Sequence, residues 1–246
     1  VAETYDGPAN DINGRHVTED HALEAIESAR NGRPQEGNVG GGTGMMTYEF
    51  KGGTGTSSRQ VTIAGNSWIV GAQVQSNFGV RHQLSILGVP VGQEITDKAH
   101  FSEMGESEQG SIIVVIGTDA PLLPNQLRRL AKRGALGIAR TGSSGGHYSG
   151  DIILAFSVAN DRDINRRNAE TPSVLQNMTC LDDHYLDAIY EAAVQSVEEA
   201  IINALVAAET VPLVKPAGKS WHKLDHQKLR EVMAKYNRLN DQSVFG

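Results

Sequence analysis

Apolar runs bounded by glycine and polar turn residues predict five strands, over 61–64, 68–75, 111–117, 135–140 and 151–157. Residues 68–75 alternate apolar and polar side chains, as a half-buried strand does, and Gly65-Asn66 predicts a tight hairpin turn just before them. Residues 111–117 instead form a continuous β-branched run, which is typical of a strand buried on both faces of a sheet. These strands predict a sheet at the centre of the fold.

The helical spacing of apolar residues predicts four helices, between Thr18 and Gly32, over 121–133 with Gly134 as its end, over 181–209 and over 223–239. Thr18 is expected to be the N-cap of the first. Glycine is so frequent over 37–57 that helix is excluded from most of that segment. Strands combined with helices that cover one side of the sheet predict an α/β protein.

The composition favours a folded domain and argues against several classes of function. Of the 246 residues, 39% are hydrophobic and 27 are glycine, which is enough for an ordinary core. The net charge is -7 and no segment mixes Lys and Arg with aromatic residues, so a nucleic-acid partner is not expected. The single cysteine, Cys180, excludes an intrachain disulfide, a CxxC pair and a multi-cysteine zinc site.

No membrane partner is predicted either. No run approaches the ~18 apolar residues of a membrane span, and the first residues form neither a basic nor an apolar leader segment. We expect a cytoplasmic protein, with the periplasm as the alternative. The chain starts at Val1 and enters a folded-looking pattern at once, which suggests that upstream sequence was removed or belongs to another polypeptide.

Two familiar motifs have structural explanations that are better than their catalytic ones. Gly142-Ser143-Ser144-Gly145-Gly146 satisfies the G-x-S-x-G string of a nucleophile elbow, but it leads into a strand instead of a helix. His222 and His226 stand four residues apart, without the third ligand or the HExxH motif of a zinc site. We therefore expect a glycine loop and a solvated helix face, and neither a metal nor another cofactor.

The junction Gly110-Ser111 has the features of a self-cleavage site. An acidic, aperiodic linker over 94–110 ends at a glycine, and the serine that follows begins a buried strand. Attack of the serine Oγ on the Gly110 carbonyl would turn the peptide bond into an ester, whose hydrolysis frees a chain that starts with both a nucleophile and an α-amine. That amine, with an ordinary pKa of about 7.7 to 8.0, can accept the nucleophile's proton without a histidine. An ordinary strand start is the alternative explanation.

Five segments closely resemble the family of autoprocessing L-aminopeptidase/D-amino-acid esterase-amidases and β-aminopeptidases, and their order spans almost the whole chain. They are Gly37-Asn-Val-Gly-Gly-Gly-Thr-Gly44, Phe50-Lys-Gly-Gly-Thr-Gly-Thr-Ser-Ser-Arg59, Asn77-Phe-Gly79, Gly110-Ser-Ile-Ile-Val-Val-Ile-Gly-Thr-Asp-Ala-Pro-Leu122 and Ser149-Gly-Asp-Ile-Ile-Leu-Ala-Phe-Ser157. The resemblance implies a four-layer αββα sandwich similar to that of N-terminal-nucleophile hydrolases, with the family's own connectivity. It also implies cleavage between Gly110 and Ser111, which would divide one composite domain into an α part over 1–110 and a β part over 111–246.

The same resemblance implies roles for individual residues, each assigned by its position in the matching segments. The resemblance implies that Ser111 is the nucleophile and that the Asn77 amide stabilises the tetrahedral oxygen. It implies that Tyr5 faces the reacting centre and that Glu3 binds the substrate's free amine. Ser149 and Asp151 match a serine and an acid that organise proton transfer, although some relatives carry glutamate in place of Asp151. Whether the α-amine of Ser111 or this pair is the kinetic base stays open.

The implied function is a serine aminopeptidase or amidase that releases N-terminal residues from short peptides, amides and esters through an acyl-enzyme, without a cofactor. A homo-oligomer, a tetramer or octamer of αβ units, is implied as well. Relatives begin well upstream of the residue that matches Val1, so missing strands would leave an exposed sheet edge. Two alternatives stay open: an acyl transferase of the ornithine acetyltransferase kind, against which the serine nucleophile speaks, and an unprocessed relative without enzyme activity.

Overall fold

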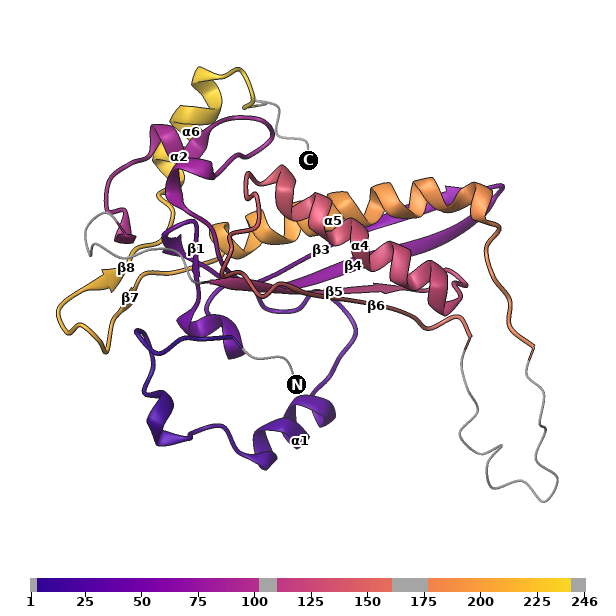
Figure 1. Ribbon diagram of the computed structural model, residues 1–246, viewed down its shortest axis with the longest axis horizontal. Coiled ribbons are helices and arrows are strands. Elements are labelled where there is room, and N and C mark those ends of the chain that lie inside the picture. Colours follow the sequence, from indigo (N-terminus) through magenta and orange to yellow (C-terminus); the bar gives the residue numbers. More distant parts are fainter. Residues whose placement is uncertain (1–3, 102–109, 161–176, 240–246) are drawn as a thin grey trace.

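The protein is built on one mixed four-stranded sheet. The computed structural model describes residues 4–101, 110–160 and 177–239 (Figure 1). The strand order is β3–β4–β5–β6, where β3 is Gly53–Ile63, β4 is Asn66–Asn77, β5 is Ser111–Thr118 and β6 is Ile152–Ser157. The β3–β4 and β4–β5 pairs are antiparallel, whereas β5 and β6 run parallel. A parallel pair needs a crossover, and α4 (Pro124–Arg140) lies in the connection between β5 and β6.

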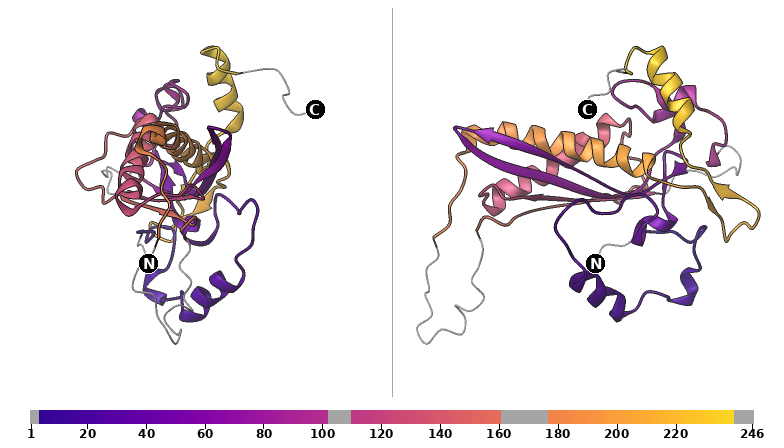
Figure 2. Two further views of the ribbon diagram at one scale, coloured as in Figure 1. Left: turned by 90° about the vertical axis from the view of Figure 1, so that its right-hand side faces the viewer. Right: turned by 180° about the vertical axis from the view of Figure 1, so that it is seen from behind.

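Helices cover one face of this sheet. The helices α4 and α5 (Leu186–Val206) run along the same side of the strands (Figures 1 and 2). The strand residues that alternate toward them are buried and form the core with the inner faces of the helices, and they include Val70, Ala72, Val74, Ile112, Val114 and Ile116. The helical layer predicted for one side of the sheet is confirmed.

Among the described residues, nothing covers the opposite face of the sheet at β6. Ile152, Leu154 and Phe156 alternate onto it, and Leu154 is 57% exposed. Of the four layers expected, the described residues therefore form one helical layer and one sheet. A stacked second sheet would pack against this apolar face, since sheets pack through such faces about 10 Å apart.

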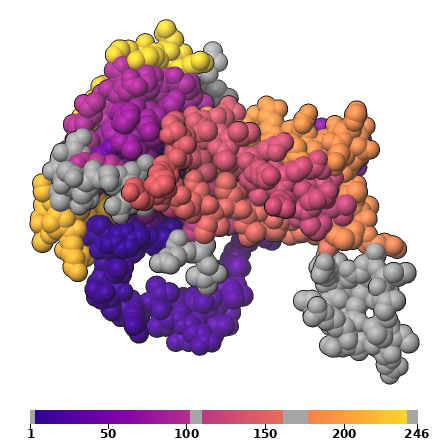
Figure 3. Space-filling view, in the orientation of Figure 1, coloured from indigo at the N-terminus to yellow at the C-terminus, as the bar shows by residue number. Residues whose placement is uncertain are grey.

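The remaining elements are short. They are η1 (Ile12–Gly14), α1 (Glu19–Glu27), η2 (Gly40–Gly44), β1 (Met46–Thr47), β2 (Phe50–Lys51), η3 (Arg81–Gln83), α2 (Val91–Glu94), η5 (Asp183–Tyr185), β7 (Val211–Pro212), β8 (Ser220–Trp221) and α6 (His226–Lys235). The segment around α1 stands out from the body as an arm (Figure 3), and α1 buries no residue. Thr18 is its N-cap, as predicted. No helix in the described segments has the length and apolarity needed to cross a membrane.

Two local predictions were wrong. The strand expected over 135–140 is helix, because α4 continues through Gly134 and Gly137. A Cβ at Gly134 would lie 2.9 Å from the Ile153 side chain, and one at Gly137 would lie 2.7 Å from the Val194 carbonyl oxygen of α5, so these glycines allow close packing instead of ending the helix. The hairpin turn is Ala64-Gly65, one residue earlier than expected. The exclusion of helix from most of 37–57 is confirmed, since only the short η2 is helical there.

Candidate active site

Ser111 and Asn77 lie opposite each other at one end of the sheet. Asn77 is the last residue of β4, Ser111 is the first of β5, and the two form a pair in the antiparallel ladder. Cα atoms of directly opposite residues are about 4.5–5.5 Å apart, and their side chains point to the same face. Here that face is the one opposite α4 and α5. The register therefore places a hydroxyl beside an amide.

Two hydrogen bonds fix the orientation of the Asn77 amide. The Met46 N–H donates to Asn77 Oδ1 at 2.9 Å, and Asn77 Nδ2 donates to the Tyr5 carbonyl oxygen at 3.1 Å. A backbone N–H can only donate, so the acceptor oxygen of Asn77 must face Met46 and its NH2 group must face the other way. The amide is held as a donor at the end of the β4–β5 ladder.

The parallel pairing of β5 with β6 brings a third segment to the same place. Parallel strands begin at the same edge of a sheet, so the residues just before β6 lie beside the start of β5. The Gly150 N–H donates to Ser111 Oγ at 2.8 Å. Asp151 Oδ1 accepts from Ser149 Oγ at 2.6 Å and from the Ile112 N–H at 3.2 Å. The turn that precedes β6 thus contacts both the Ser111 hydroxyl and the residue after it.

Gly110 is packed too closely for any side chain. A Cβ there would lie 2.0 Å from the Asn77 carbonyl oxygen and 3.1 Å from Phe78 Cα. These are backbone atoms at the end of a strand and cannot move as a flexible side chain can. The residue before Ser111 must therefore be glycine for the chain to pass Asn77 at this distance.

Tyr5 reaches the site through its main chain. Its carbonyl oxygen accepts the Asn77 amide hydrogen. The residue is exposed, and its ring folds back over Gly7, where a Cβ would lie 2.5 Å from the tyrosine hydroxyl oxygen. Glu3, expected to bind the substrate amine, lies outside the described residues. All the other predicted site residues lie together at one end of the sheet.

This arrangement suits acyl transfer to a hydroxyl. It combines a serine Oγ, an oriented amide donor for a developing oxyanion, and a carboxylate that orders a neighbouring hydroxyl. Cleavage before Ser111 would add an α-amine to the same point. The chemistry needs these groups within a few ångströms of one acyl carbon, and two strand pairings supply that proximity.

Comparison with known proteins establishes the family. The sequence profile of peptidase family S58 matches residues 1–217 of this chain. The chain belongs to peptidase family S58. It is 48% identical over 253 residues to the beta-peptidyl aminopeptidase BapA of Sphingosinicella microcystinivorans, an alignment that covers 97% of this chain and 61% of that protein.

Solved structures agree with this S58 assignment. The L-aminopeptidase D-Ala-esterase/amidase of Ochrobactrum anthropi, a prototype of the serine aminopeptidases and a variant of the Ntn hydrolase fold, is similar with a TM-score of 0.88 and 48% identity, over 96% of this chain and 62% of that one. A Burkholderia sp. beta-aminopeptidase gives a TM-score of 0.81 and 40% identity, over 94% and 63%. The family resemblance and the α/β fold of the Ntn hydrolase type are confirmed. This chain spans about three-fifths of the length of these relatives.

Two donors that contact the candidate site residues were not predicted from sequence. They are the Gly150 N–H on Ser111 Oγ and the Met46 N–H on Asn77 Oδ1. Every residue except proline has such a group, so residue identity carries no signal for it. The glycine-rich neighbourhood of both segments was the only available hint, because it indicates close backbone approach.

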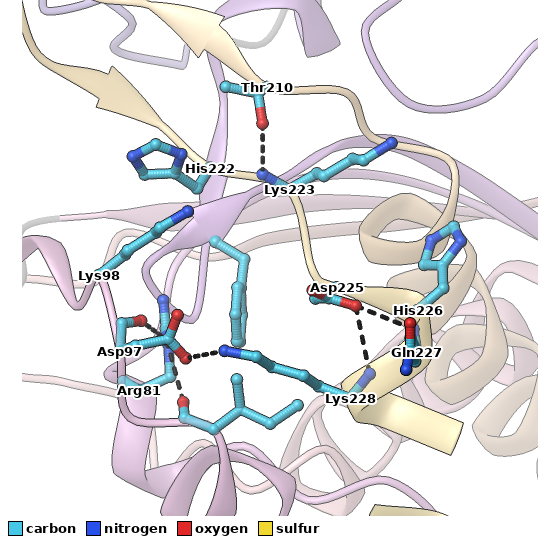
Figure 4. Close-up of a pocket in the computed structure, with 12 residues that line it drawn as sticks. Arg81, Asp97, Lys98, Thr210, His222, Lys223, Asp225, His226, Gln227 and Lys228 are labelled. Atoms are coloured by element: carbon cyan, nitrogen blue, oxygen red, sulfur yellow. Dashed lines mark hydrogen bonds and ion pairs between the residues drawn. The ribbon is translucent and has the colours of Figure 1, made fainter. Parts of the chain in front are cut away.

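A separate hollow of about 390 Å³ lies between β2, the loop after α2 and the start of α6, and none of the site residues above lines it (Figure 4). Its walls are basic, but most of their charges are already used within the fold. Arg81 donates to four main-chain carbonyl groups, Lys228 Nζ lies 2.9 Å from Asp97 Oδ1, and Asp225 caps α6 by accepting from two of its N–H groups. The hydrogen bond from Lys228 is the largest cause that lowers the pKa of Asp97. We assign this hollow to the packing of α6, not to the reaction.

The G-x-S-x-G string and the His222/His226 pair form neither a nucleophile elbow nor a shared metal site. The loop after Gly142 leads into β6, so Ser144 is not on a nucleophile elbow. His222 precedes α6 and is not on one helix face with His226, whose Nε2 lies 3.0 Å from the Val206 carbonyl oxygen, because α6 starts later than predicted. Within 4–101, 110–160 and 177–239, no group of three or more His, Cys, Asp or Glu side chains is arranged to hold a metal.

Proposed function

We propose that the protein is a self-cleaving serine aminopeptidase or amidase with Ser111 as its nucleophile. The observation that carries the proposal is the cross-strand pair of Ser111 with Asn77, beside the turn that holds Ser149 and Asp151. The relatives named as aminopeptidases support the same activity. None of those names points to an acyl transferase.

Maturation is the first step of this proposal. Ser111 Oγ attacks the Gly110 carbonyl carbon, the C–N bond breaks, and the acyl group moves from nitrogen to oxygen as an ester. Water then hydrolyses the ester, which leaves a carboxylate on Gly110 and a free hydroxyl and α-amine on Ser111. The products are an α part over 1–110 and a β part over 111–246 that remain one composite domain.

Substrate hydrolysis repeats this chemistry on an external acyl group. Ser111 Oγ attacks the carbonyl carbon of a short peptide, amide or ester that has a free N-terminal amine, and the oxyanion receives a hydrogen bond from Asn77 Nδ2. The proton of the hydroxyl passes to a base, either the new α-amine or the Ser149–Asp151 pair, and then to the leaving group. Water releases the N-terminal residue from the acyl-enzyme. Glu3 is the proposed partner of the substrate amine.

The proposed activity is tested with an aminoacyl p-nitroanilide and two serine variants. Ser111→Ala should abolish both cleavage at 110/111 and p-nitroaniline release. Ser144→Ala is the matched control, since this exposed serine belongs to the G-x-S-x-G string and should keep both. Normal turnover by Ser111→Ala, or loss of turnover in Ser144→Ala alone, would overturn the proposal.

We further propose that αβ units assemble into a homo-oligomer. This proposal rests on the family resemblance, because the apolar face of β6 is already accounted for by contact with a second sheet. Light scattering coupled to gel filtration tests the tetramer or octamer, and a monomer at micromolar concentration would contradict it. The cytoplasmic location stays a prediction from the sequence.

A further inference from the structure

Lys51 is a fully buried lysine beside the candidate active site. It is the second residue of β2, and its side chain is 0% exposed. Its Nζ donates to the Gly42 carbonyl oxygen at 2.8 Å and to the Gly52 carbonyl oxygen at 2.7 Å. An ammonium group is costly to bury, so such a lysine is kept only where its hydrogen bonds are needed.

The two carbonyls that Lys51 holds flank the β1–β2 pair, because Gly42 lies in η2 just before Met46 and Gly52 directly follows β2. The Gly42 carbonyl oxygen also accepts from the Met45 N–H, and the Gly52 N–H donates to the Met45 carbonyl oxygen at 2.8 Å. Met46 is the strand partner of Lys51 in the β1–β2 pair. The next hydrogen bond is that of the Met46 N–H to Asn77 Oδ1. A short series of contacts therefore leads from the buried ammonium to the amide of the site.

No described acid forms an ion pair with Lys51. Burial alone lowers its pKa to about 8. Glu49, on the same β1–β2 turn, accepts from the Arg81 and Phe101 N–H groups, and His222 meets Lys51 through its main-chain oxygen. The ammonium group is therefore directed at the two glycine carbonyls.

We propose that Lys51 is a positioning residue, which ties Gly42 to Gly52 and thereby fixes the Met46 N–H that orients the Asn77 amide. This inference rests on the proposed function, in which Asn77 stabilises the oxyanion. An oxyanion donor works only when it is aligned before the reaction, and a misplacement of about 1 Å costs on the order of 100-fold in rate.

Hydrogen exchange tests the positioning without any substrate. Lys51→Met removes both hydrogen bonds of Nζ, and exchange of the Met46 N–H should become at least about 10-fold faster. Gln126→Leu is the matched control, because Gln126 is also buried and its Nε2 also makes two hydrogen bonds, to the Leu181 carbonyl oxygen and Asp183. The control should leave Met46 exchange unchanged. Unchanged Met46 exchange in Lys51→Met would overturn the inference.

A double-mutant cycle with Asn77 tests the route of the effect. Lys51→Met should lower kcat by about 10- to 100-fold with little change in KM, but by less than about 2-fold in an Asn77→Ala background. Equal loss in both backgrounds would mean that Lys51 acts only on general stability and would overturn the inference. If Lys51→Met does not fold, Lys51→Gln, which keeps one amide donor, is used in both experiments with the same criteria. Absence of hydrolysis by the unmodified protein would contradict the proposed function, whereas the exchange result would still decide the positioning role.

Discussion

Replacement of Gly110 by alanine probes the geometry of self-cleavage most sharply. The added Cβ would lie 2.0 Å from the Asn77 carbonyl oxygen, where ordinary contact begins at 3.4 Å. Relief of that overlap requires a displacement of about 1.4 Å between the Gly110 backbone and the end of β4. The β4–β5 ladder holds Asn77, so the Gly110 carbonyl must move relative to Ser111 Oγ. Misplacement by about 1 Å costs on the order of 100-fold, and we expect Gly110→Ala to cleave about 100-fold more slowly.

The assay is the first-order appearance of the two fragments on a denaturing gel after synthesis of the chain in vitro. Gly150→Ala is the control, because a Cβ at Gly150 meets nothing nearer than Ser111 Oγ at 3.6 Å and the Gly150 N–H remains in place. It should cleave within about 3-fold of the unmodified rate. Unimpaired cleavage of Gly110→Ala, or equal loss in both variants, would refute the reasoning.

Three further predictions concern the site, the stability and the sheet face. Asp151→Asn should lower kcat for p-nitroanilide hydrolysis by about 100-fold, because the carboxylate that orders Ser149 loses its charge, and Asp151→Glu should recover most of it; full activity of Asp151→Asn would contradict this role. Burial raises the pKa of Glu36, but hydrogen bonds from Arg33 and Thr56 more than offset it and leave that pKa below 4.5. The stabilisation by Glu36 is therefore present above pH 4.5 and is lost as the pH falls through its folded-state pKa. Glu36→Gln should lower Tm more at pH 7 than under acid conditions, and an equal loss at both would be contrary evidence. The exposed face of β6 opposite α4 and α5 should bind the apolar dye 1-anilinonaphthalene-8-sulfonate, so the double variant Leu154→Lys with Phe156→Lys should reduce the fluorescence of bound dye several-fold. Unchanged fluorescence would contradict dye binding at this face.

The local pattern of the sequence was enough to predict three of the four strands, β4, β5 and β6. The alternation over 68–75 corresponds to β4, and the β-branched run that starts at Ser111 corresponds to β5. The end of α4 could not be predicted, because Gly134 and Gly137 look like helix stops and only tertiary packing on Ile153 and α5 makes them part of the helix.

The grouping of the candidate site has a different origin. The neighbourhood of Ser111 and Asn77 depends on the register of β4 with β5, and that of Asp151 depends on the parallel pairing of β6. Both pairings join residues that are far apart in the sequence, and the spacing of residues along the chain does not predict them. The family resemblance was therefore needed to connect these residues. No residue pattern identifies the backbone N–H donors of Met46 and Gly150. The same holds for the hydrogen bonds by which Lys51 joins Gly42 to Gly52.

Intact mass measurement with N-terminal sequencing of the purified protein tests the central claim most directly, since it requires no substrate. The account predicts two fragments, one of which begins Ser111-Ile112-Ile113, and a Ser111→Ala variant that stays whole. A single uncut chain of 26.4 kDa after prolonged incubation, or a new N-terminus at any other residue, would contradict the assignment of Ser111 as the nucleophile released by self-cleavage.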